Sequence, residues 1–224
     1  MLINADFSRR AIVTPQQYRW LASPQAGVER VMLDRIGAEK GRATSIVHYA
    51  PDTGFPDHRH PGGEEILVLS GTFCEGDAHY PAGWYLRNPP GSGHQTSSPA
   101  GALIFVKLAQ MPRHEQQSVR IDTRAPNTWR RQDGRELCPL FYSPAEQVGL
   151  HRLAAYENLS LMPSANIELL ILTGGMMMEA SFYESGSWIR LPPGDSPEFT
   201  AGAEGATVYL KTCPSSAQAI ETSP

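Results

Sequence analysis

Three histidines and one glutamate form the densest group of metal-ligating side chains in this sequence. His58, His60 and Glu64 lie close together, and His94 follows later in the chain. Imidazole nitrogens and a carboxylate are the donors that a borderline divalent metal prefers. The other histidines stand apart, at positions 48, 79, 114 and 151. The spacing therefore predicts a metal site built from His58, His60, Glu64 and His94.

Two kinds of metal centre are open to these four donors. They could close a tetrahedral shell around zinc, which would make a structural or sensing site. They could also leave two positions free on an octahedral iron, manganese or nickel ion. Those free positions would bind a bidentate substrate or O2 and permit dioxygenase chemistry. The four residues are the same in both cases.

The elements that must position these donors are predicted to be short strands. The chain has 20 glycines and 19 prolines in 224 residues, with few long apolar helical patterns, which is typical of a mostly β protein. We expect strands at 43–49, 66–73, 84–88 and 102–108. Because side chains alternate across a strand, His58 and His60 should face the same side. A turn at 61–63 would return Glu64 beside them, and a later strand would bring His94 into the barrel interior.

An internal repeat organises the chain. At an offset of 103 residues, the segment 65–71 aligns without gaps on 168–174, and Gly83 aligns on Gly186. Arg87 aligns on Arg190, and the Pro-Pro-Gly at 89–91 aligns on 192–194. Two copies of one domain follow from this alignment.

The second copy lacks the candidate ligands. The four positions become apolar residues or proline, namely Leu161, Pro163, Ile167 and Pro197. A ligand cluster without its metal would leave unpaired polar groups in the interior, so replacing the whole set removes that cost. Glu65 is kept as Glu168, which favours Glu64 as the ligand. For Glu65 we expect a structural pairing, such as a salt bridge with Arg87.

The repeat and the composition divide the chain into three parts. We predict a metal-binding domain with an N-terminal arm at 1–112, a linker at 113–127, where apolar periodicity disappears, and a metal-free domain at 128–224. Within the arm, Thr14 as a cap and Pro15 at the first helical position predict a single helical turn.

Composition argues against several classes of protein. The net charge is −4, from 19 basic and 23 acidic residues with no basic run, which excludes a phosphate-binding face for nucleic acid. No apolar run has the length of a membrane span, and no leader pattern begins the chain, so we expect a cytoplasmic protein. Three widely spaced cysteines, Cys74, Cys138 and Cys213, fit neither a disulfide framework nor a zinc ribbon.

The two ligand-bearing motifs resemble those of the cupin superfamily, which are small jelly-roll barrels. All four ligand positions of the cupin motifs are present. The sequence departs from them at two other positions, since Gly54 is two residues nearer to His58 and the final Asn is Ser98. With the repeat, the resemblance implies an all-β chain of two tandem cupin barrels.

More narrowly, residues 25–112 resemble the cupin domain of ChrR-type anti-sigma factors. That resemblance implies that His58, His60, Glu64 and His94 bind zinc, with iron, manganese or nickel still open. ChrR proteins hold their sigma factor with a helical zinc domain bearing an HxxxCxxC motif, and this sequence has no such motif. The resemblance therefore does not extend to binding a sigma factor.

Three functions remain open from the sequence. The first is a metal-binding bicupin with a sensing, regulatory or small-ligand-binding role. The second is an Fe(II)-dependent dioxygenase acting on a small carbonyl or diketone. The third is a structural partner protein that uses the second barrel as an interface. We expect a homodimer, because sheet edges are exposed and cupins commonly form dimers.

Overall fold

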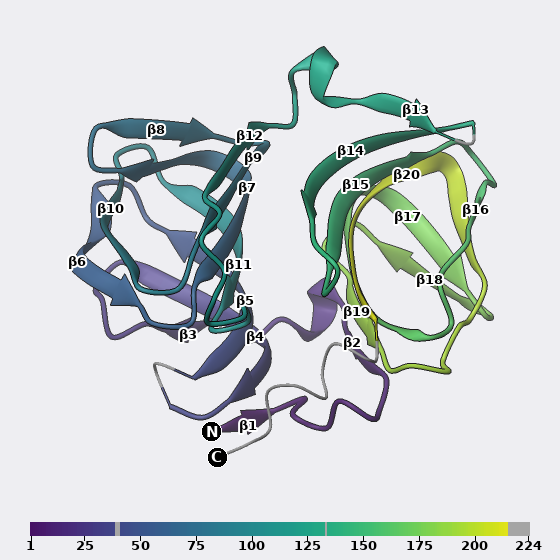
Figure 1. Cartoon of the computed structure of the whole chain (residues 1–224), viewed down its shortest axis with the longest axis horizontal. Coiled ribbons are helices and arrows are strands. Elements are labelled where there is room, and N and C mark those ends of the chain that lie inside the picture. Colours follow the sequence, from purple (N-terminus) through teal and green to yellow (C-terminus); the bar gives the residue numbers. More distant parts are fainter. Residues whose placement is uncertain (39–40, 133, 215–224) are drawn as a thin grey trace. The chain divides into compact units, whose positions relative to one another are not determined.

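The chain folds almost entirely into antiparallel strands. The structure, a computed structural model, describes residues 1–38, 41–132 and 134–214. Its strands form an 11-stranded and a 9-stranded sheet, each curled into a barrel (Figure 1). The helices among the described residues are two 3-10 turns, η1 (Pro15–Gln17) and η2 (Pro126–Thr128). The prediction of an all-β chain with two tandem jelly-roll barrels is confirmed.

Contacts divide the chain into two units that each contain one barrel. Unit 1 consists of Met1–Ala5 and Arg19–Ala125, and unit 2 of Asp6–Tyr18 and the chain from Pro126 onward. The sequence predicts that the whole N-terminal arm belongs to the first domain, 1–112. Residues 11–13 instead pair with an edge strand of unit 2, so the arm is shared between the units. The predicted helical turn after Thr14 is present as η1.

In unit 1 the sheet follows the order β1-β4-β5-β11-β7-β10-β6, with β3, β8, β9 and β12 paired beside this path. The strands are β1 (Leu2–Ile3), β3 (Leu21–Ala22), β4 (Val28–Ile36), β5 (Arg42–Tyr49), β6 (Thr53–His60), β7 (Glu64–Glu75), β8 (Ala78–Pro81), β9 (Trp84–Asn88), β10 (Ser92–Ser98), β11 (Ala102–Leu108) and β12 (Val119–Asp122). The four strands expected from the sequence correspond to β5, β7, β9 and β11. Their alternating apolar residues form a buried core that includes Ile66, Val68, Phe73 and Ile104.

In unit 2 the order is β13-β14-β15-β20-β17-β19-β2, with β16 and β18 beside it. The strands are β2 (Ala11–Val13), β13 (Arg130–Gln132), β14 (Arg135–Tyr142), β15 (Gln147–Leu153), β16 (Asn158–Leu159), β17 (Ala165–Met178), β18 (Ser181–Glu184), β19 (Trp188–Leu191) and β20 (Phe199–Pro214). Its apolar core includes Ile167, Met178, Leu191 and Phe199.

The two units have the same backbone conformation at a pair of matching glycines. Gly71 in β7 has φ 70°, and Gly174 at the matching position of β17 has φ 69°. At each, a Cβ would collide with a backbone carbonyl oxygen, that of Gly101 or of Gly205. Only glycine meets both demands without strain. The internal repeat predicted from the sequence is therefore a repeat of strand geometry.

The segment predicted as a linker contains a strand. β12, at 119–122, pairs with β9 along the edge of the unit 1 sheet. In unit 2 the same edge, β19, is covered by β2 from the N-terminal arm. Residues 119–122 do alternate between apolar and polar side chains, but four residues are too few to stand out from the polar segment around them.

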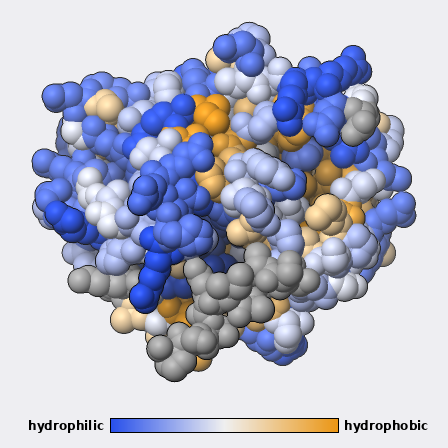
Figure 2. Space-filling view, viewed as in Figure 1, coloured by the Kyte–Doolittle hydropathy of each residue, from blue (hydrophilic) through white to orange (hydrophobic). Residues whose placement is uncertain are grey.

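Most of the visible face of the molecule is hydrophilic, with apolar colour in limited areas (Figure 2). The large hydrophobic side chains that remain most exposed are Met1, Leu2, Tyr142, Tyr156 and Phe182.

Candidate metal centre

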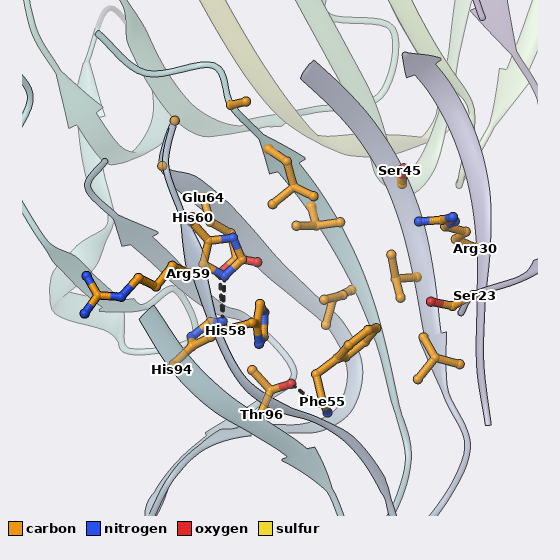
Figure 3. A pocket seen from close by; sticks show the side chains of 18 of the residues that line it. Ser23, Arg30, Ser45, Phe55, His58, Arg59, His60, Glu64, His94 and Thr96 are labelled. Atoms are coloured by element: carbon orange, nitrogen blue, oxygen red, sulfur yellow. Dashed lines mark hydrogen bonds and ion pairs between the residues drawn. The ribbon is translucent and has the colours of Figure 1, made fainter. Parts of the chain in front are cut away.

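Three histidine rings converge inside unit 1. His58 and His60 come from the end of β6, and β10 pairs antiparallel with it so that His94 lies opposite His58. The ring centroids of the three pairs are 4.7 to 4.9 Å apart. One nitrogen from each ring lies within 4.8 Å of the others. The spacing-two prediction for β6 therefore places His58 and His60 on one face, as Figure 3 shows.

Glu64 joins this group through a tight turn. Gly63 has φ 76°, a left-handed conformation that turns the chain between β6 and β7. The Glu64 carboxylate then lies 3.4 Å from His94 Nε2 and 3.6 Å from His60 Nε2. It is nearly buried, with 6% of the residue exposed. Three imidazoles and a buried carboxylate are a donor set that fits a divalent ion.

The pKa values of His60 and His94 are shifted in opposite directions. Burial lowers the pKa of His60, although the nearby Glu64 charge opposes this shift. Burial also disfavours the charged form of His94, but a hydrogen bond to Glu75 and the charge of Glu64 outweigh it, so the pKa of His94 is raised. Neutral imidazole is the form that binds a metal. His60 is thus held in a ligating form by its surroundings.

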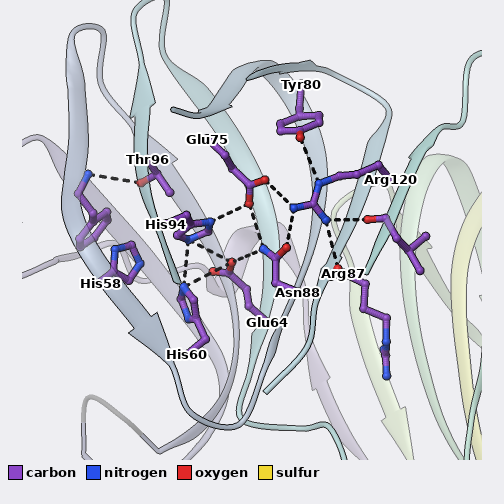
Figure 4. A network of polar contacts seen from close by, with 12 residues as sticks. His58, His60, Glu64, Glu75, Tyr80, Arg87, Asn88, His94, Thr96 and Arg120 are labelled. Atoms are coloured by element: carbon purple, nitrogen blue, oxygen red, sulfur yellow. Dashed lines mark hydrogen bonds and ion pairs between the residues drawn. The ribbon is translucent and has the colours of Figure 1, made fainter. Parts of the chain in front are cut away.

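A polar network behind His94 was not predicted from the sequence. His94 Nδ1 lies 2.7 Å from Glu75 Oε1, and Asn88 donates one amide group to both Glu64 and Glu75, at 3.2 and 3.0 Å. Arg120 donates to Glu75 Oε2 at 2.7 Å and to Asn88 Oδ1 at 2.6 Å (Figure 4). Burial opposes ionisation of Glu75, yet these partners lower the pKa of Glu75 to about 2.

The repeat contained a signal for part of this network. At the offset of 103, Glu75 aligns on Met178 and Asn88 on Leu191, the same change from polar to apolar that marks the ligands. Arg120 lies outside the aligned region, and only strand pairing brings it to the site.

A cavity of about 290 Å³ opens beside the histidines. Its wall is mainly apolar and includes Val28, Tyr49, Phe55, Ile104 and Val106. The candidate ligands lie on one side, and Ser23, Arg30 and Ser45 lie on the other (Figure 3). A small molecule in this cavity would therefore meet the histidines at one end and polar side chains at the other.

Glu65 has the structural partner that was predicted for it. Its Oε2 accepts a hydrogen bond from Arg87 Nη1 at 3.3 Å, and the Arg87 side chain is fully buried. In unit 2, Glu168 pairs in register with Arg190, although its carboxylate accepts from Trp188 Nε1. At the lost ligand positions, Ile167 is buried and Leu161 packs against the apolar core.

Other predicted features lie outside the cluster. Cys74 is buried with its Sγ 3.1 Å from His79 Nδ1, and Cys74, Cys138 and Cys213 are all free thiols. Ser98, at the position of the missing motif Asn, donates its hydroxyl to the carbonyl oxygen of Thr72. No helix in the described ranges has the length and hydropathy that crossing a membrane would require.

Comparison with known proteins agrees with this architecture. Residues 8–112 match the family model of the ChrR Cupin-like domain. A proposed dioxygenase from Nostoc punctiforme has a similar structure, with 14% identity, a TM-score of 0.71, and coverage of 97% of this chain and 83% of its own. Bacterial pirin YhhW from Escherichia coli, in complex with nickel(II), has 11% identity, a TM-score of 0.67, and coverage of 92% and 99%. No curated protein sequence matches significantly.

Two barrels of jelly-roll type, one with a histidine and glutamate cluster inside it, define a class of β-barrel protein with a candidate metal centre. Residues 8–112 match the ChrR Cupin-like domain, and the chain as a whole shares its fold with the solved structures.

Proposed function

We propose that unit 1 is a metal-dependent receptor for a small ligand, with a sensing or regulatory role. The metal is held by His58, His60, Glu64 and His94. The observation that carries this proposal is the cavity of about 290 Å³, whose wall contains all four side chains. A closed structural zinc site needs no such space, whereas a site that exchanges a ligand keeps an open position.

The cavity also indicates the chemical class of the ligand. Its volume lies near the lower limit of ligand pockets, about 300 Å³, and its walls are mainly apolar. A compact apolar molecule with oxygen donors at one end would place those oxygens at the metal. Its apolar part would contact Tyr49, Phe55 and Ile104.

Zinc is the ion we propose, because the ChrR resemblance implies it. Iron, manganese and nickel would accept the same donors. The pirin neighbour was solved with nickel, which shows that a barrel of this fold can hold a different ion. Elemental analysis and X-ray absorption on protein purified without added metal would identify the ion and its coordination number.

Two variants test the metal site. His94→Ala should abolish stoichiometric metal. His48→Ala is the matched control, because His48 belongs to the same unit but is exposed, 4.0 Å from Glu29 and edge-on to the Trp20 ring, away from the candidate ligands. Retention of a full equivalent of metal by His94→Ala, or purification of the natural protein without metal under all conditions, would contradict the proposal.

The second candidate is an oxygen-dependent enzyme, and the same cavity supports it because O2 and a small carbonyl compound could both reach the ligands. When bound, Fe(II) would supply electron transfer to O2. Oxygen uptake with Fe(II)-loaded protein and a β-diketone would favour this candidate. Ligand binding without oxygen uptake across a broad panel of small carbonyl compounds would favour the receptor.

The assembly is a separate proposal. We propose a homodimer that forms without a sigma factor. Gel filtration with and without a chelator would measure the oligomer and its dependence on metal.

A further inference from the structure

Glu75 fixes the orientation of the His94 ring. Its Oε1 lies 2.7 Å from Nδ1, so Nδ1 is the nitrogen engaged on this side, and Nε2 is left to face Glu64 and His60. Both partners are about 10% exposed, which limits competition from water. A carboxylate on the far nitrogen of a ligating imidazole sets its tautomer and makes the ring a stronger donor to a metal.

Arg120 in turn holds Glu75. Its guanidinium donates to Glu75 Oε2 at 2.7 Å and to Asn88 Oδ1 at 2.6 Å, and Nε donates to the Tyr80 hydroxyl at 3.1 Å. Nη1 donates to the carbonyl oxygens of Arg87 and Val119, at 3.1 and 2.8 Å. Five hydrogen bonds thus hold the planar guanidinium, although 30% of the side chain is exposed, and its Nη2 donates to both groups that contact the candidate ligands.

Asn88 connects Arg120 and Glu75 to Glu64, the other candidate ligand in this network. Its Nδ2 donates to Glu64 Oε2 at 3.2 Å and to Glu75 Oε1 at 3.0 Å, and its Oδ1 accepts from Arg120. Because an amide has one carbonyl oxygen, the bond from Arg120 decides which way the Asn88 amide points. Arg120 therefore acts on both Glu64 and His94 through one neighbour each.

The metal-free unit shows what the same barrel uses without this network. Glu75 and Asn88 align on Met178 and Leu191, which are buried in the apolar core of unit 2. Arg120 pairs with Leu86 on the edge strand of unit 1, and Ile12 pairs with Ile189 at the equivalent place in unit 2. Ile12 packs against the apolar core.

The buried ion pair beside the network, unlike the network itself, keeps its residue types in unit 2. Glu65 and Arg87 persist as Glu168 and Arg190, so buried charge as such is tolerated in unit 2. The polar groups behind His94 are replaced together with the ligands. A purely structural role on this sheet edge would give no reason for that joint loss.

The site could instead be considered for a second cation, because donor atoms of Glu64, Glu75 and His94 also lie within 4.8 Å of one another. The Arg120 guanidinium already supplies a positive charge at 2.7 Å from Glu75. Coulomb repulsion from this charge opposes a cation there. The arrangement is better suited to holding one metal site than to making two.

We infer that Arg120 is a positioning residue of the metal centre, acting through Glu75 and Asn88, and that β12 is therefore part of the site. This inference rests on the proposed metal binding. It extends the site beyond the four candidate ligands to β12, the last strand of the unit 1 sheet in sequence.

The test is a double-mutant cycle of metal affinity, measured by zinc competition with a chromophoric chelator. Glu75→Gln should weaken zinc binding about 10- to 100-fold, as outer partners of ligands typically do. Arg120→Met should weaken it about tenfold. The double variant should lose clearly less affinity than the product of the two single losses, because Arg120 acts in part through Glu75. Arg124→Met is the matched control, since Arg124 lies on the same segment in an exposed ion pair with Asp122.

A second measurement follows the protonation and orientation of the His94 ring. Histidine ring NMR of the zinc-loaded protein should show the His94 Nδ1–H signal, and Arg120→Met should shift it while the His48 signals stay unchanged. If Arg120→Met does not fold, Arg120→Lys carries the same test, because it keeps the charge and loses the fork. It should give an intermediate loss of affinity.

The outcomes separate this inference from the proposed function. Natural protein that binds no zinc would overturn the proposed function. Natural protein that binds zinc while Arg120→Met and Arg120→Lys both stay within twofold of it would overturn only the role of Arg120. Multiplicative losses in the double variant would also overturn it, because they would mean that the two residues act independently.

Discussion

Adjacent glutamates at the start of β7 provide the sharpest test of the division between metal ligand and structural residue. We predict that Glu64→Gln removes metal binding and preserves the fold, whereas Glu65→Gln preserves metal binding and weakens the fold. The two substitutions are chemically identical and one position apart, so each serves as the control for the other.

The magnitude for Glu65→Gln follows from the burial of its partner. The Arg87 and Glu65 side chains are 0% and 4% exposed, and their charged atoms are 3.3 Å apart. Breaking one side of a buried ion pair costs about 3–5 kcal/mol. Glu115 remains 3.9 Å from Arg87 and would compensate in part. We therefore expect a loss of about 2–4 kcal/mol in the free energy of unfolding.

The magnitude for Glu64→Gln follows from its place among the histidines. Losing a ligand should cost more than the roughly 10- to 100-fold in affinity that follows loss of an outer partner. Stability of the metal-free protein should change by less than about 1 kcal/mol, because burial already favours neutral His60 and His94 can release its proton when the carboxylate charge is removed. Asn88 still finds an acceptor in the glutamine side chain.

The assays are urea unfolding of the metal-free variants and zinc competition titration of the folded ones. The reasoning would be refuted if Glu65→Gln lost metal affinity as strongly as Glu64→Gln. It would also be refuted if Glu64→Gln were the variant with the larger loss of stability.

Three further predictions follow from the structure. Removing metal with a chelator should lower the melting temperature of the natural protein but not of His58→Ala, because a ligand that binds only the folded state stabilises it; calorimetry measures both. Gly71→Ala and Gly174→Ala should each lower stability by more than about 1 kcal/mol in urea unfolding, since φ is positive and a backbone carbonyl stands where the Cβ would go; equal stability would contradict this. Burial, aided by the Arg135 charge, lowers the pKa of His151 to about 4 from 6.5, so only the unfolded state gains a proton as pH falls from 6.5 towards 4; stability should fall by about 1–2 kcal/mol between pH 6.5 and 5, and His151→Gln should flatten that part of the profile.

Much of the architecture could be predicted from the sequence because the repeat compares the barrel with itself. The glycines at 71 and 174 lie at the same offset and have the same φ, and the strands around them have matching pairings. The four candidate ligands follow from the same comparison, because three histidines and a glutamate are lost together in the second copy.

The domain boundaries were harder to predict, because a short edge strand leaves little pattern in a sequence. β2 and β12 have three and four residues, too few to show a clear alternation. Their partners, β19 and β9, are far away in the chain, so local propensity carries no information about the pairing.

By itself, the sequence determined the candidate ligands, their spacing on β6 and the absence of the whole set from the second barrel. Alternation along a strand is a local pattern, and an internal repeat compares the sequence with itself. Only the tertiary structure decided that Glu75, Asn88 and Arg120 lie behind His94. These residues come from β7, β9 and β12, and antiparallel pairing across the sheet brings them within hydrogen-bond distance. Hydrogen bonds depend on separation in space and not in sequence. For this reason β12, the last strand of the unit 1 sheet, can contribute a side chain to the candidate site.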